Sequence, residues 1–123
     1  MKFLHLLLGS AAGGLARYLL ASSVYRVAGA GFPYGTLAVN LAGCFLLGLL
    51  AGLAEDKLLL GPDARLLLMI GFCGAFTTFS TFIFETDNLL REGEWLAALL
   101  NVTVSVFLGF ALFRGGRMLI DLV

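Results

Sequence analysis

The sequence predicts an all-α membrane protein with four transmembrane helices, from its composition, its length and the spacing of its apolar runs. The chain has 123 residues, of which 60% are hydrophobic and 13% are charged. Soluble domains carry roughly 25% charged residues, so this chain has about half the charge that a water-facing surface needs. Because one spanning helix takes about 20 apolar residues, four spans with short loops use almost the whole length. We therefore expect a single four-helix membrane domain over residues 1–123.

The first two spans are expected at about residues 4–27 and 35–54. A turn rich in glycine and proline at residues 29–33 separates them. A signal peptide is the alternative interpretation of the N-terminus, but the apolar run continues past Arg17 to the length of a spanning helix. The second span ends at the charged residues 55–57. Two glycine pairs in these spans are spaced for close helix packing, namely Gly9 with Gly13 and Gly48 with Gly52.

The third span, at about residues 64–86, has an irregular centre. Residues 71–82 read GFCGAFTTFSTF, a mixture of glycine, hydroxyl and aromatic residues that disfavours a regular helix. Gly71 and Gly74, which precede Thr77, predict a break in the middle of this helix. Such a break frees backbone groups near the midplane of the membrane. Freed amides favour an anion, whereas freed carbonyls favour a cation such as Na⁺.

The fourth span is expected at about residues 95–113, between a charged loop and a basic segment. Loops as short as these make consecutive helices antiparallel, so both termini lie on one side of the membrane. That side would hold five basic residues against two on the other: Lys2, Lys57, Arg65, Arg114 and Arg117 against Arg26 and Arg91. The positive-inside rule then favours cytoplasmic termini.

Several polar side chains fall inside the predicted spans, where each needs a partner, a cavity or a pore. They are Arg17, Asn40, Thr77, Thr78, Ser80, Thr81, Glu85, Asn101, Thr103 and Ser105. Most are neutral hydrogen-bond donors, which can replace the hydration shell of an anion without trapping it. The competing interpretation is that the hydroxyls bond back to their own helix. The hydroxyls from Thr77 to Thr81, at a predicted break, favour an anion pathway.

Other positions inside the spans admit two interpretations each. Phe79 and Phe82 share a helical face, where they either pack or present the positive edges of their rings to a halide. Arg17 is either a residue that attracts anions at the mouth of a pathway or a charge paired with Glu85. Glu85 is either an anchor at the membrane interface or part of a polar pathway.

Several functional classes are disfavoured. A net charge of zero disfavours nucleic-acid binding, which needs a basic surface. Cys44 and Cys73 lie in separate apolar runs, so neither a metal cluster nor a disulfide is expected. His5 is the only histidine and has no nucleophile and carboxylate grouped with it, so we do not expect an enzyme.

The main functional alternative is a small four-helix multidrug or cation exporter, which has about this length and is dimeric. Proton-coupled export of cations needs a carboxylate deep in a span, and such exporters resemble a pattern with that glutamate in the first span. Here the first span has no acidic residue and contains Arg17 instead. A membrane scaffold without transport is a third interpretation, which predicts that replacing Phe79 or Phe82 changes no ion flux.

Three segments resemble the signature segments of the CrcB/Fluc fluoride channels: GGLARY at 13–18, PYGTLAVNLAG at 33–43 and GFCGAFTTFSTF at 71–82. The chain also resembles that family in length and in the number of spans. The resemblance implies a fluoride-selective ion channel that exports cytoplasmic fluoride passively and lowers its toxicity. It implies a multi-pass protein of the inner (plasma) membrane.

The resemblance also implies an antiparallel, dual-topology homodimer with two fluoride pores along its interface. A structural Na⁺ at the dimer centre would be held by the backbone carbonyls of Gly74 and Thr77. One feature fits poorly, because a chain that inserts in both orientations should have balanced basic residues. Pairing of a singly oriented chain with an oppositely oriented homologue is the alternative, and we favour the homodimer.

By the same resemblance, Phe79 and Phe82 would be the paired phenylalanines of the fluoride pore, with Asn40 of the second span near them. Ser80, Thr81 and Glu85 resemble the polar track that leads away from the phenylalanines. Arg17 resembles the family's vestibule arginine.

Overall fold

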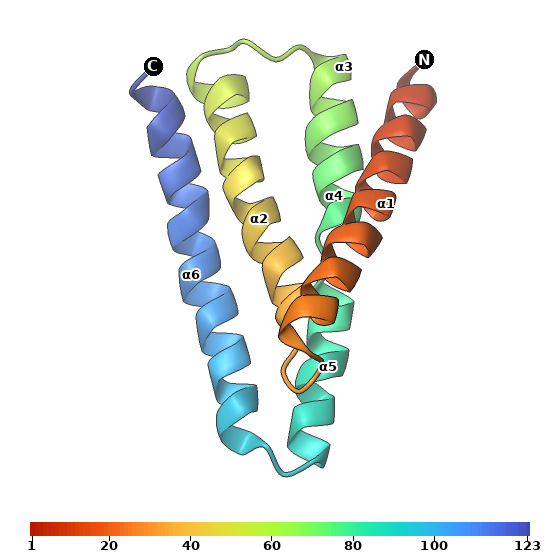
Figure 1. Cartoon of the computed structure of the whole chain (residues 1–123). Coiled ribbons are helices and arrows are strands. Elements are labelled where there is room, and N and C mark those ends of the chain that lie inside the picture. The colour runs from red at the N-terminus through yellow and green to blue at the C-terminus, as the bar shows by residue number, and fades with distance from the viewer.

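The computed structural model describes all 123 residues, which form four long helical spans (Figure 1). The spans are Lys2–Ala28, Tyr34–Asp56, Pro62–Arg91 and Trp95–Asp121, and each is long and apolar enough to cross a membrane. Consecutive spans run antiparallel, and both termini lie at the same end of the molecule (Figure 1). The prediction of an all-helical chain with four helices long and apolar enough to span a membrane is confirmed. The last two helices run beyond the apolar runs, because charged residues can continue a helix into water.

The first span is one uninterrupted helix, α1 (Lys2–Ala28), which ends at Gly29. Gly29 has a φ of 87°, a left-handed conformation that glycine adopts without steric cost. The second span begins as α2 (Tyr34–Ala51) directly after Pro33 and continues into the π-helical segment η1 (Gly52–Asp56). A short loop then leads to the third span.

The third span consists of four helical segments: α3 (Pro62–Ala64), the π-helical η2 (Arg65–Cys73), α4 (Gly74–Phe76) and α5 (Phe79–Arg91). Between α4 and α5, Thr77 (φ −92°, ψ 159°) and Thr78 (φ −150°, ψ 121°) have extended backbones. The side chain of Thr78 caps α5 by accepting a hydrogen bond from the backbone N–H of Thr81. A turn at Gly93 joins α5 to the last helix, α6 (Trp95–Asp121).

Glycines bring the helices close together, and the packing role predicted for both glycine pairs is confirmed. A side chain at Gly9 or Gly13 of α1 would collide with the backbone of Leu67 or Phe72 in the third span. On α2, a side chain at Gly48 would collide with the backbone of Phe113 in α6. A side chain at Gly52 would meet the side chain of Ile120, and one at Gly116 would collide with the backbone of Phe45. These contacts set α1 against η2 and α2 against α6.

Few large side chains are buried within one copy of the chain. Phe107 and Trp95 of α6 are 72% and 70% exposed, and Phe79 of α5 is 74% exposed. In a bilayer such apolar surface faces lipid or another protein, because lipid tails are as apolar as these side chains.

Candidate functional site

The two extended residues of the third span are held in place by Asn40 of α2. The Asn40 Nδ2 donates to the carbonyl of Thr78 at 2.9 Å, and the N–H of Thr78 donates to the Asn40 Oδ1 at 2.8 Å. The side-chain amide thus satisfies both backbone groups of a residue that lies outside any helix. This matters in a membrane, where an unsatisfied backbone group costs several kcal/mol.

Two backbone carbonyls are left without partners at the same place. In a continuous helix, the carbonyls of Gly74 and Thr77 would accept from the N–H groups of residues 78 and 81. Here the N–H of Thr78 donates to Asn40, and the N–H of Thr81 donates to the Thr78 hydroxyl at 3.3 Å. No hydrogen bond reaches the carbonyl of Gly74 or Thr77. Both carbonyls are therefore available as ligands.

A cavity of about 360 Å³ brings together the paired phenylalanines and Asn40 predicted for the pore and the two residues predicted to hold Na⁺. Its walls include Asn40, Gly74, Thr77, Phe79 and Phe82. The rings of Phe79 and Phe82 have centroids 5.8 Å apart and planes tilted by 48°. Phe82 is buried, with 8% exposed, whereas Phe79 is largely exposed on the outer face. The two rings thus span from the interior of the bundle to its surface.

Ser105 of α6 lines the same cavity and was singled out in the sequence only as a polar residue inside a span. Its Oγ is buried and has no hydrogen-bond partner. The fourth span therefore contributes a serine with an unpartnered hydroxyl to the wall of this cavity.

A second cavity, of about 330 Å³, brings together two of the three predicted track residues and the predicted vestibule arginine. Its walls include Arg17 of α1 and Thr81 and Glu85 of α5, together with Thr36 of α2. Thr78 lines both this cavity and the one beside the phenylalanines. The extended segment therefore lies between the two cavities.

The carboxylate of Glu85 accepts a hydrogen bond from Tyr25 and forms no ion pair with Arg17. The Tyr25 hydroxyl donates to the Glu85 Oε2 at 2.8 Å, while the Oε1 is buried without a partner. Arg17 remains in the wall of the second cavity. The ion pair with Glu85, one of the two interpretations of Arg17, is therefore absent from the structure.

Ser80 is the predicted track residue that the structure does not bring to either cavity. It is exposed on α5, and its neighbours Phe79 and Thr81 line the two different cavities. In a single copy of the chain, Ser80 faces outward.

Sequence reasoning missed Tyr25 and Thr36. The Tyr25 hydroxyl lies 3.5 Å from the Thr36 Oγ1 and accepts from the Thr36 N–H at 3.5 Å. A tyrosine near the end of a span resembles an ordinary interfacial aromatic. The one feature of the sequence that could have indicated them is the antiparallel order of the spans. This order places the end of the first span beside the start of the second and the end of the third.

Comparison with known proteins identifies the family. Residues 4–117 match the model of the family described as CrcB-like protein, Camphor Resistance (CrcB). A relative from Maridesulfovibrio salexigens, called a fluoride-specific ion channel FluC, is 47% identical over 96% of this chain and 94% of its own length. Relatives with the same name from Solidesulfovibrio magneticus and Chlorobaculum tepidum are each 51% identical, over 91% and 93% of this chain and 93% and 90% of their own lengths. The chain belongs to the CrcB family of membrane proteins.

Proposed function

We propose that this chain is the subunit of a fluoride-selective ion channel that lets cytoplasmic fluoride leave the cell passively and so lowers its toxicity. The observation that carries the proposal is the cavity in which Asn40, Phe79 and Phe82 meet at the interruption of the third span. Relatives about half identical to the chain are named fluoride-specific ion channels. The proposed location is the inner (plasma) membrane. Fluoride efflux from liposomes tests the proposal, because a channel needs no energy source and no second substrate.

The residues of the first cavity suit a small, strongly hydrated anion. An anion that leaves water must find donors in place of its hydration shell. The positive edges of the Phe79 and Phe82 rings can contact it while keeping the cavity apolar. Asn40 holds the extended segment beside these rings through its two bonds to Thr78. We therefore assign Phe79, Phe82 and Asn40 to the fluoride pore.

The second cavity supplies a polar route away from the phenylalanines. Thr81 contributes a hydroxyl, and the guanidinium of Arg17 gives the cavity a positive charge that attracts anions. We assign Thr81, Ser80 and Glu85 to the polar track and Arg17 to a vestibule. A proton-coupled cation exporter would need a carboxylate in the first span. Because α1 has none, this alternative is disfavoured.

A homodimer of oppositely oriented subunits is part of the proposal. Phe79 is 74% exposed although it lines the first cavity, and Gly74 has open space around it. A second copy over this face would close the cavity and bury the ring. The same face would then form both the pore and the dimer interface.

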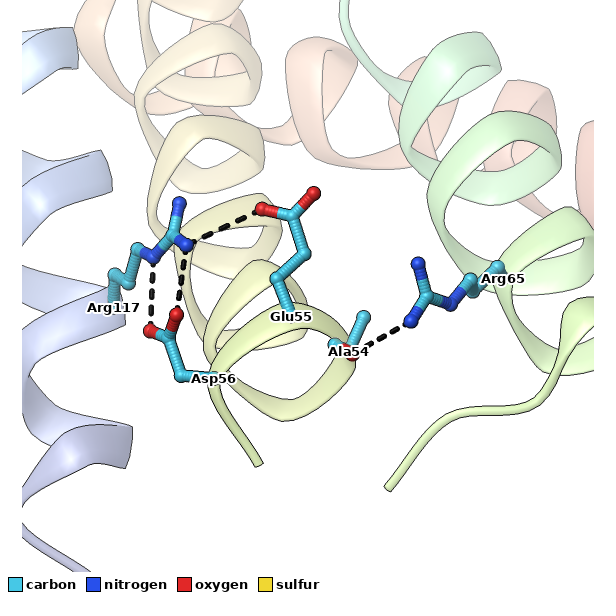
Figure 2. A network of polar contacts seen from close by, with 5 residues as sticks. All are labelled: Ala54, Glu55, Asp56, Arg65 and Arg117. Carbon is cyan, nitrogen blue, oxygen red and sulfur yellow. Dashed lines mark hydrogen bonds and ion pairs between the residues drawn. The ribbon is translucent and has the colours of Figure 1, made fainter. Parts of the chain in front are cut away.

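Two of the five basic residues at the end that holds the termini have polar partners within the chain. Arg117 forms two hydrogen bonds to Asp56, at 2.9 and 2.8 Å, and an ion pair with Glu55 at 3.3 Å (Figure 2). Arg65 donates to the backbone carbonyls of Ala54 and Leu60. The positive charge of Arg117 is therefore paired with acidic residues at the end of the molecule that holds both termini.

Labelling of a cysteine added at the C-terminus tests the dual orientation. In a variant without Cys44 and Cys73, a membrane-impermeant reagent should label about half of the chains from each side of the membrane. Labelling from one side only would contradict the homodimer and favour pairing with an oppositely oriented homologue.

We also propose a structural Na⁺ held by the carbonyls of Gly74 and Thr77. Its support is that neither carbonyl has a hydrogen bond and that both residues line the cavity on the exposed face. Backbone carbonyls freed by an interrupted helix are the ligands that Na⁺ takes in membrane proteins. When bound at the dimer centre, the ion would neutralise the partial negative charges of carbonyls from both copies.

Protein prepared throughout with N-methyl-D-glucamine in place of Na⁺, at equal ionic strength, should therefore contain fewer dimers. The fraction of dimer is read by size-exclusion chromatography with light scattering, and restoring Na⁺ should restore it. An equal dimer fraction in both cations would contradict the site.

A further inference from the structure

Two residues lie between the second cavity and a third one at the end of the molecule. The third cavity, of about 260 Å³, is lined by Gly31 and Pro33 of the α1–α2 loop and by Glu92 after α5. Only Tyr25 and Glu85 line both the third and the second cavity. The Tyr25 hydroxyl donates to the Glu85 Oε2 at 2.8 Å. A hydrogen-bonded pair thus separates two cavities that follow one another toward the end of the bundle.

The tyrosine is seated firmly against α2. A side chain at Gly35 would collide with the Tyr25 ring, so the glycine makes the space that the ring fills. The hydroxyl also accepts from the N–H of Thr36 at 3.5 Å. The position of the hydroxyl is therefore set by packing as well as by Glu85.

The carboxylate is held less firmly than the tyrosine. Its Oε2 has the bond from Tyr25, whereas its Oε1 is buried without any partner. A buried carboxylate that lacks a donor on one oxygen gains free energy by turning toward another donor. Arg17 is the one cationic residue in the wall of the second cavity, which Glu85 also lines.

We propose that the Tyr25–Glu85 hydrogen bond closes the passage between the second and third cavities, and that its opening lets fluoride pass between them. Tyr25 is then a positioning residue, which holds the carboxylate across the passage. A negative carboxylate in this position repels an anion. When the bond opens, the carboxylate can turn aside and its negative charge leaves the passage. The inference rests on the proposed fluoride channel and concerns its exit toward the α1–α2 loop.

Tyr25→Phe tests the closure because it keeps the ring and removes the hydroxyl. A hydrogen bond to a charged group changes an equilibrium by about tenfold or more, so fluoride efflux from liposomes should rise by about that factor. Tyr34→Phe is the matched control, since the Tyr34 ring lies against Phe32 at the start of α2, tilted by 51°, and lines none of the three cavities. Efflux that stays equal to the unaltered protein, or falls, would overturn the proposal.

A second measurement does not depend on fluoride conduction. In a variant without Cys44 and Cys73, Thr81→Cys places a thiol in the second cavity. Its rate of reaction with an anionic methanethiosulfonate reagent in nanodiscs should rise several-fold with Tyr25→Ser and stay unchanged with Tyr34→Ser. An unchanged rate with Tyr25→Ser would overturn the closure. If the rate rises but the unaltered protein releases no fluoride, the closure stands and the proposed function fails.

Discussion

Replacing Phe82 with isoleucine is expected to reduce fluoride efflux by about tenfold or more while the protein stays folded. Phe82 is 8% exposed, lines the first cavity and lies with its ring centroid 5.8 Å from that of Phe79. Isoleucine keeps most of the bulk but has no positive ring edge to offer the ion. Efflux is read with a fluoride electrode on liposomes, and folding is read from the dimer fraction in detergent.

Phe84→Ile is the matched control for this experiment. Phe84 lies on the same helix, is 65% exposed and lines none of the three cavities. Its replacement should leave efflux unchanged. If Phe82→Ile and the unaltered protein show equal efflux, Phe82 is not part of the ion pathway.

Asn40→Ala is expected to destabilise the protein and abolish fluoride efflux. The change deletes the bonds at 2.9 and 2.8 Å and leaves the N–H and carbonyl of Thr78 unpaired. At about 1–3 kcal/mol for each buried group left unsatisfied, the loss is about 2–6 kcal/mol. Because these bonds hold the extended segment beside the phenylalanines, the pore loses its shape as well. A thermal melt in detergent and the efflux assay measure the two effects.

Asn101→Ala separates this effect from the general cost of removing a buried asparagine. Asn101 is 2% exposed and donates to the Thr86 hydroxyl at 2.9 Å. Its removal leaves no backbone group unpaired, because its side-chain amide bonds to a hydroxyl that keeps its own bond to the carbonyl of Phe82. Asn101→Ala should melt at a higher temperature than Asn40→Ala and keep most of the efflux. Similar melting and efflux for Asn40→Ala and the unaltered protein would show that the extended segment does not need Asn40.

Much of the fold follows from local features of the sequence. The four apolar runs, separated by the turn at residues 29–33 and by charged segments, are visible in the sequence because a bilayer demands long apolar segments. The interruption lies at Thr77 and Thr78, within the segment where glycines and hydroxyls disfavour a helix. The π-helical segments were not predicted, because they depend on packing between helices and have no strong sequence signal.

The contacts of the site depend on pairings that sequence alone does not reveal. Asn40 bonds to a residue 38 positions away and Tyr25 to one 60 positions away. Neither pairing has a local signal, since each follows from how α1, α2 and α5 lie against one another. The motif resemblance supplied Asn40, Phe79 and Phe82 as pore residues, whereas Tyr25 and Thr36 emerged only from the geometry.

The measurement that tests the central claim most directly is passive efflux of fluoride and chloride, in parallel, from liposomes that contain the purified protein. We expect rapid release of fluoride when the membrane potential is dissipated, and no release of chloride above that of protein-free liposomes. Liposomes that retain fluoride although the protein is folded and dimeric, or that release both anions equally, would contradict a fluoride-selective channel.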